Sequence, residues 1–167
     1  MGRGMLYVGA ALMLGVLTAF FNMMAERKAN PNRQVESLTT GEYRQVRLKR
    51  NAAGHYVATG AINGQPVTFL VDTGATAVSI PAKLADRLGL PRGPQIALST
   101  ANGTARGWLT RIPSVQLGDI RLESVRGTIT DGMDGEQVLL GMTFLKHLQL
   151  RQEGEYLILI QPWGNPS

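Results

Sequence analysis

Three two-residue turn signals divide the chain, from about Tyr43 onward, into short stretches in which apolar and polar residues alternate. Asn-Gly is the strongest short hairpin signal, because both central residues of a type I′ turn need a positive φ. Three such hairpins predict a mainly β domain. The predicted hairpins join 56–62 to 67–71 through Asn63-Gly64, 95–99 to 107–112 through Asn102-Gly103, and 114–117 to 120–125 through Gly118-Asp119.

Two short helices and a closing strand complete the predicted domain. The first helix is expected over 81–89, where Pro81 fits the first turn and Gly89 fits the C-terminal stop. A second short helix is expected near 142–147. The chain then closes with a strand over 156–160, after a turn at Glu153-Gly154.

Composition removes several classes of function. The chain has 167 residues, which allows one ordinary domain with a tail, and 44% hydrophobic residues, which excludes wholesale disorder. It has no Cys, so disulfides, thiol nucleophiles, iron–sulfur clusters and thiolate zinc sites are excluded. The net charge of +5 is modest, and the basic residues are scattered along the chain. No aromatic residues alternate with them and no known nucleic-acid-binding motif is present, so no nucleic-acid partner is expected.

The N-terminal segment differs from the rest of the chain because it carries no charge from Gly4 to Ala25. About twenty helical residues at 1.5 Å each cross about 30 Å of hydrocarbon. We therefore expect 1–25 to be a transmembrane anchor, with a cleaved signal peptide as the alternative. The polar segment 26–42 is expected to be a flexible tether, which leaves 43–167 as the folded domain.

The residue that most clearly carries chemistry is Asp72. The apolar stretch Phe69-Leu70-Val71 runs directly into Asp72-Thr73-Gly74-Ala75. A carboxylate buried at the end of such a strand is costly unless it is hydrogen-bonded or shares a proton. Gly74 allows a tight turn whose backbone N–H approaches the carboxylate. An ordinary surface turn is the alternative interpretation of this tripeptide.

Other reactive constellations are weak. His55 and His147 are the only histidines, and two histidines without Cys make a poor metal site, so no metal is expected. Ser79 and Ser99 lie outside any nucleophile-elbow pattern, which argues against a Ser-His-Asp triad. No P-loop or dinucleotide-binding glycine pattern occurs, and no cofactor is expected.

The chain resembles retropepsin-like aspartic proteases in three features. These are the apolar stretch ending in Asp72-Thr73-Gly74-Ala75, a later apolar stretch ending in Gly141, and a Gly-containing hairpin over 99–107. The segments 54–60, 63–66, 99–103 and 139–142 resemble more closely the bacterial, membrane-anchored, single-domain members. The likeness covers about 46–161. Viral members commonly carry a further Asp where Thr76 stands, so the mode of substrate binding is left open.

The resemblance implies a closed, mostly β, acid-protease-like barrel with one or two short helices. It implies that Asp72 is catalytic and that Thr73 joins interlocking hydrogen bonds beneath two active-site loops. It further implies supporting roles for Gly74 at the substrate-facing edge, for Ala75, and for Gly141 on a strand behind the Asp loop. The flap that covers substrate would contain Ala101, Asn102, Gly103 and Thr104.

Aspartic proteases use two carboxyl groups that share one proton: one activates the attacking water, and the other donates to the carbonyl oxygen. The chain contains one Asp-Thr-Gly. Asp131-Gly132 and Asp134-Gly135 lack the preceding apolar strand and the following Thr, and are expected to form a loop. The second carboxylate must then come from a second copy, because a residue on a twofold axis meets its own counterpart.

The sequence therefore predicts an aspartic endopeptidase that acts on extended peptides as a homodimer, without metal or cofactor. The alternative is a non-catalytic, dimeric peptide-binding module of the same fold, and a less favoured one is a membrane scaffold. The resemblance implies a single-pass protein of a bacterial inner membrane with a periplasmic domain. Basic residues after the anchor would by themselves favour the cytoplasmic side.

Overall fold

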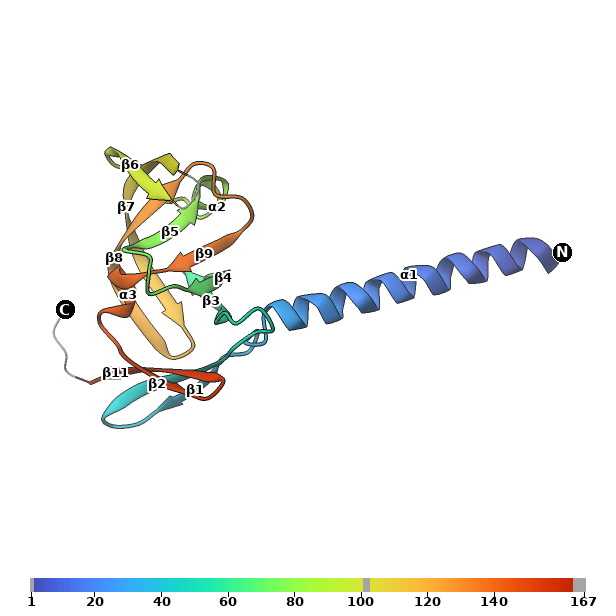
Figure 1. Cartoon of the computed structure of the whole chain (residues 1–167), viewed down its shortest axis with the longest axis horizontal. Helices are drawn as coiled ribbons and strands as arrows, with labels where there is room; N and C mark the ends of the chain where they lie inside the picture. The colour runs from blue at the N-terminus through green and yellow to red at the C-terminus, as the bar shows by residue number, and fades with distance from the viewer. Residues whose placement is uncertain (1, 101–102, 164–167) are drawn as a thin grey trace.

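The computed structural model describes residues 2–100 and 103–163. Helix α1 (Gly2–Ala29) projects away from a domain made mostly of strands (Figure 1). The domain contains two sheets, which confirms the predicted mainly β fold. The smaller sheet has the order β1 (Glu36–Thr39), β2 (Tyr43–Lys49), β11 (Tyr156–Pro162) and β10 (Gln149–Glu153).

The larger sheet has seven strands and mixes parallel with antiparallel pairs. Strand β3 also pairs with β7 at Ala61↔Gln116 and Ile62↔Val115, which folds the sheet back on itself. Strand β6 pairs with β7 and lies at one edge of this arrangement, and the closed barrel implied by the resemblance stays a prediction. Its strands lie in the order β3 (Val57–Ile62), β4 (Gln65–Val71), β9 (Gln137–Leu140), β5 (Val78–Pro81), β8 (Ile120–Thr130), β7 (Gly103–Leu117) and β6 (Gln95–Thr100).

The turns follow the local rules that predicted them. Asn63 and Gly64 have φ values of 51° and 77°, the left-handed pair that a type I′ hairpin needs between β3 and β4. Gly118 (φ 56°) begins the turn between β7 and β8. Helices α2 (Ala82–Arg87) and α3 (Met142–Leu145) lie within the segments predicted to be helical.

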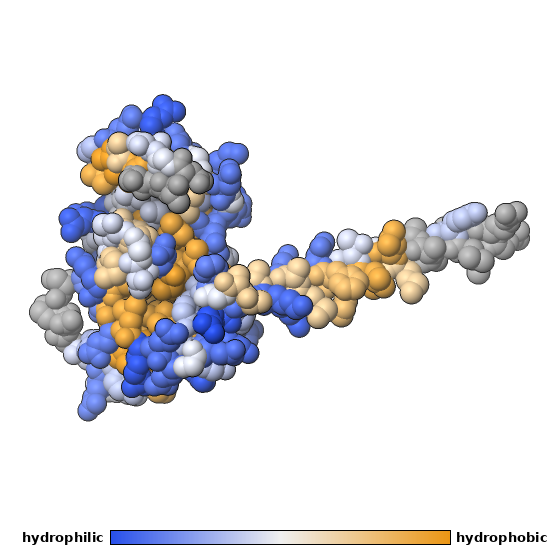
Figure 2. All heavy atoms as spheres, in the orientation of Figure 1, coloured by the Kyte–Doolittle hydropathy of each residue, from blue (hydrophilic) through white to orange (hydrophobic). Residues whose placement is uncertain are grey.

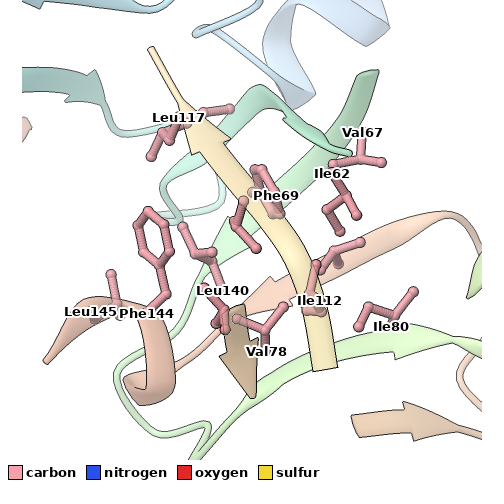
Figure 3. Packing of buried hydrophobic residues seen from close by; sticks show 14 of the residues in the cluster. Ile62, Val67, Phe69, Val78, Ile80, Ile112, Leu117, Leu140, Phe144 and Leu145 are labelled. Atoms are coloured by element: carbon pink, nitrogen blue, oxygen red, sulfur yellow. The ribbon is translucent and has the colours of Figure 1, made fainter. Parts of the chain in front are cut away.

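One buried cluster joins the two sheets, because it contains residues of the larger sheet together with Leu48 and Leu157 of the smaller one. Phe69 lies near Leu117, Ile62 and Leu140 in Figure 3, and all four side chains are fully buried. Phe144 of α3 closes the same cluster. Burying a large apolar side chain contributes about 1.5–3 kcal/mol, so this cluster is the principal support of the strands that carry the site.

The segment predicted to be a flexible tether is instead docked on the domain. Asn32 is 5% exposed and its side-chain amide donates to the carbonyls of Lys49 (2.9 Å) and Val57 (2.7 Å). Its Oδ1 accepts the backbone N–H of Lys49 at 2.7 Å. Further on, β1 pairs with β2, and Thr39 donates to Asp119 at 2.7 Å. A short polar segment can thus become ordered when one buried amide satisfies several backbone groups.

The predicted N-terminal helix is present, and it continues through Glu26, Arg27 and Lys28 to Ala29. Its described side chains are exposed, many of them apolar, as Figure 2 shows. In the described part of the chain, however, no helix combines the length and apolarity needed to cross a membrane. This finding does not support the transmembrane anchor that the uncharged run predicts.

Replacing Asn32 should destabilise the domain. Asn32→Ala would leave the N–H and C=O of Lys49 and the C=O of Val57 without their partner, so we expect the free energy of unfolding to fall by about 2 kcal/mol. Chemical denaturation of the full chain measures this. Gln34→Ala, at an exposed position without a hydrogen bond from its side chain in the described structure, is the matched control. Equal stability of the two variants would contradict the docking role of Asn32.

Candidate active site

The position of Asp72 follows from the pairing of β4 with β9. These strands run parallel, with Leu70 opposite Leu139 and Val71 opposite Leu140. The backbone N–H of Asp72 donates to the carbonyl of Leu140 at 3.2 Å, so the ladder continues one residue beyond β4. Asp72 therefore lies where two largely buried strands end together, and its side chain is half-buried.

The turn after Asp72 orients its carboxylate. The backbone N–H of Gly74 donates to Asp72 Oδ1 at 2.8 Å, and that of Ala75 donates to the Asp72 carbonyl at 3.2 Å. Among the described residues, Oδ2 of Asp72 accepts no hydrogen bond and no cation pairs with the carboxylate. One oxygen is thus held by the backbone while the other is available to a second group.

Gly141 lies directly behind this turn and is buried. A Cβ at this position would lie 2.6 Å from the carbonyl oxygen of Ala75 and closer still to that of Ala77. Both distances are far shorter than real carbon–oxygen contacts, so only glycine fits. The close approach explains why an apolar strand ending in Gly was a useful signal next to Asp72.

Helix α3 fixes the turn from the same side. The N–H of Met142 donates to the carbonyl of Ala75 at 2.8 Å, and that of Thr143 to the carbonyl of Thr76 at 3.2 Å. The Thr143 hydroxyl accepts the N–H of Val78 at 3.0 Å. Sequence reasoning did not identify Thr143 as part of the site. Its only local signal was its position two residues after Gly141.

Thr73 is exposed, and its hydroxyl makes no hydrogen bond to another described residue. The role that the resemblance implies for Thr73, in interlocking hydrogen bonds beneath two active-site loops, stays a prediction. Its exposure at the tip of the turn leaves the hydroxyl open to such a contact.

The hairpin predicted to be a flap is formed by β6 and β7. The two strands pair through Ser99↔Thr104 and Thr100↔Gly103, and Gly103 has a φ of 108°. Ala101 and Asn102, also assigned to the flap, lie outside the described residues. Trp108 packs partly on the core, and the guanidinium carbon of Arg92 lies 5.2 Å from the centroid of its ring.

Asp131 follows strand residues that are buried without forming an apolar run, because the last four residues of β8 are Gly, Thr, Ile and Thr. It nevertheless begins a turn, as expected, with Gly132 at φ 76°. Its carboxylate lies 3.9 Å from the Arg106 guanidinium, so unlike Asp72 it faces a cation.

The described residues contain no cluster of three or more His, Asp or Glu side chains that would hold a metal ion. Glu136 pairs with Arg87 at 2.5 Å, and this guanidinium lowers the pKa of the Glu136 carboxyl. Both groups are fully exposed, so the pair belongs to the solvated surface and not to the site. Asp72 is thus a single, uncompensated carboxylate at the end of two paired strands.

Sequence comparison finds a family match over most of the domain. The profile of the family described as "gag-polyprotein putative aspartyl protease" matches residues 58–147. A curated relative, the "Uncharacterized protein in cobV 5'region" of Sinorhizobium sp, is 29% identical over 111 residues, which is 65% of this chain and 48% of that protein. The chain therefore spans about half the length of this relative.

One solved structure supports the same fold, and a second is reported with it. The crystal structure of a retropepsin-like aspartic protease from Rickettsia conorii superposes with a TM-score of 0.58 at 26% identity, covering 69% of this chain and 98% of that one. The EIAV protease complexed with the inhibitor HBY-793 gives a TM-score of 0.48 at 20% identity, covering 59% and 92% of the two chains.

Proposed function

Because this chain belongs to the retropepsin-like aspartic protease family, we propose that it is an endopeptidase that hydrolyses peptide bonds with a pair of Asp72 carboxylates, one from each of two copies. The observation that carries the proposal is the state of Asp72. Its carboxylate is oriented by the Gly74 N–H, is not neutralised by a cation in the described structure, and lies at the end of two paired strands.

The chemistry divides between the two carboxyl groups. The ionised one accepts a proton from a water molecule, whose oxygen attacks the carbonyl carbon of the peptide bond. The protonated one donates its proton to the carbonyl oxygen, which gives a neutral tetrahedral intermediate. The first carboxyl group then gives its proton to the amide nitrogen, and the second takes a proton from a hydroxyl of the intermediate. The C–N bond breaks, the amine leaves, and the pair again holds one proton. Two carboxyl groups about 3 Å apart share one proton, because both cannot be ionised at that distance.

A second copy supplies what one chain lacks. The sequence has one Asp-Thr-Gly, and a twofold axis beside Asp72 brings its counterpart to the same water. The exposed Thr73 hydroxyl, which has no partner among the described residues, supports a contact across that axis. In this arrangement Gly141 and Thr143 act within each copy, because they hold the Asp72 turn from behind.

The substrate we propose is an extended peptide that lies between the Asp72 pair and the hairpin of β6 and β7. An extended chain offers backbone N–H and C=O groups that pair with a hairpin, and this mode needs no cofactor. Closure of the hairpin over the peptide would exclude water other than the nucleophile.

Digestion of a peptide library by the full chain, at acidic and at neutral pH, tests the activity. We expect internal cleavage, and we expect specific activity per chain to rise with protein concentration, because the active species is a dimer. Mass spectrometry of the products and activity measured across a dilution series provide the readout. Binding of peptides without cleavage would favour the non-catalytic module of the same fold, and constant specific activity down to monomeric concentrations would reject the shared site.

A further inference from the structure

Two arginines oppose each other on the antiparallel pair of β7 and β8. Arg111 lies directly across from Arg126 in the register of this pair, and both residues are exposed. Like charges at directly opposed positions of a sheet are destabilising. Neither guanidinium pairs with a carboxylate in the described part of the chain. An anion bound between the two guanidinium groups would therefore reduce the repulsion between them.

Arg111 is held in place by neutral groups. Its Nη1 donates to Ser124 Oγ at 2.8 Å and to the Ser124 carbonyl at 3.3 Å. Ser124 has a φ of 57°, a left-handed conformation that costs free energy for a residue other than glycine. This geometry presents both of its oxygens to one guanidinium. Arg111 is thus oriented without being neutralised, which is what an anion-binding site needs.

A groove of about 330 Å³ lies against the same two arginines. Its floor is apolar: Leu109 is 45% exposed, and Pro91 and Pro94 line the same groove. The backbone around the groove is fixed, because the N–H of Gly93 donates to the Leu109 carbonyl at 2.8 Å and the Leu109 N–H donates to the Pro94 carbonyl at 3.0 Å. The groove is therefore preformed. It is lined by Pro91, Arg92, Gly93, Pro94, Leu109, Thr110, Arg111, Arg126 and Gly127.

The third arginine of the groove is already neutralised. Arg92 pairs with Asp86 at 2.7 Å, and its guanidinium lies beside the Trp108 ring. The net charge of the groove therefore comes from the opposed Arg111 and Arg126, at one end of an apolar floor. A carboxylate accepts two parallel hydrogen bonds from a guanidinium, which makes it a well-matched anion for this end.

We propose that this groove binds a polypeptide segment in which an acidic residue adjoins an apolar one. The carboxylate lies between Arg111 and Arg126, and the apolar side chain covers Leu109. An inorganic anion would use the charge but would leave the exposed Leu109 side chain uncovered, whereas a peptide satisfies both. The net charge of +5 also favours an acidic partner.

Two strands, β9 and β5, lie between β8, which lines the groove, and β4, which ends at Asp72. Gly127, which lines the groove, is paired with Val78 at the start of β5, the strand that follows the Asp72 turn. The groove and the Asp72 turn therefore belong to one continuous sheet, whose strands are labelled in Figure 1. The binding needs no cleavage, so it goes beyond the proposed protease activity and stands or falls separately from it.

The test uses the full chain carrying Asp72→Asn, so that a bound peptide is not cut. The probes are fluorescein-labelled Ala-Ala-Leu-Glu-Ala-Ala and the same peptide with Gln in place of Glu, followed by fluorescence anisotropy. We expect the Glu peptide to bind about five- to tenfold more tightly, and this preference to decrease with added salt. Arg111→Gln and Arg126→Gln should each remove most of the preference.

Arg151→Gln is the matched control, because Arg151 is also an exposed strand arginine, on β10, and pairs with Glu153 at 2.8 Å. It should keep the preference. Thermal unfolding without peptide gives a second measurement: removing one of two opposed charges should leave the melting temperature of Arg126→Gln unchanged or higher. Equal binding of the two peptides would overturn the proposal. So would a preference that survives both arginine substitutions, or full displacement of the Glu peptide by inorganic phosphate at equal concentration.

Discussion

Asp72→Asn is expected to lower kcat/KM for peptide cleavage by about 10³- to 10⁴-fold while the fold stays intact. The asparagine Oδ1 can still accept the Gly74 N–H that now holds Asp72 Oδ1 at 2.8 Å, so the turn is preserved. An amide, however, cannot take a proton from water or share one with its counterpart. Steady-state kinetics on a cleaved peptide and thermal unfolding measure the two halves of this prediction.

Asp131→Asn is the matched control for this substitution. Asp131 also follows a buried strand, but its carboxylate lies near Arg106. We expect kcat/KM to stay within about twofold of wild type, since exposed ion pairs contribute little. Cleavage that survives Asp72→Asn at nearly the wild-type rate, or an equal loss in the Asp131 variant, would show that Asp72 does not have the role proposed for it.

Gly141→Ala, which adds one methyl group, is expected to lower the free energy of unfolding more than any other such addition near the site. The new Cβ would overlap the carbonyl oxygens of Ala75 and Ala77, which are backbone atoms and cannot turn aside. Overpacking of this kind costs about 3 kcal/mol or more. The Asp72 turn must shift to relieve the overlap, so peptide cleavage should fall together with the free energy of unfolding.

Gly41→Ala adds the same methyl group where nothing lies within 4 Å. We expect its stability to stay within about 0.5 kcal/mol of wild type and its activity to be unchanged. Chemical denaturation and peptide kinetics of the two glycine variants, measured side by side, provide the comparison. If Gly141→Ala were as stable and active as Gly41→Ala, the close packing behind the Asp72 turn would not be needed for stability or activity, and the prediction would be wrong.

Local features of the fold could be predicted from the sequence because short-range chemistry decides them. Asn63-Gly64 forms a hairpin turn since both residues tolerate a positive φ. Gly89, with a φ of 65°, follows the end of α2 for the same reason. The strand ending in Asp72 and the one ending in Gly141 were recognisable because continuous apolar runs are typical of strands buried on both faces.

Other features depend on partners far away in the chain and could not be predicted. The burial of Asn32 depends on Lys49 and Val57, and nothing near Asn32 in the sequence signals these hydrogen bonds. The opposition of Arg111 to Arg126 depends on the register of β7 and β8. The burial of Thr128 and Thr130 before Asp131 depends on packing and not on hydropathy, so the sequence does not signal it.

The most direct test of the shared active site is a mixing experiment. Wild-type and Asp72→Asn chains, carrying different affinity tags, are combined at a series of ratios under conditions in which subunits exchange completely, and peptide cleavage is measured at each ratio. If each site needs one Asp72 from each copy, every mixed dimer is inactive, so activity per wild-type chain should fall to about half at equal amounts and towards zero with excess variant. Activity per wild-type chain that stays constant at every ratio would contradict the account.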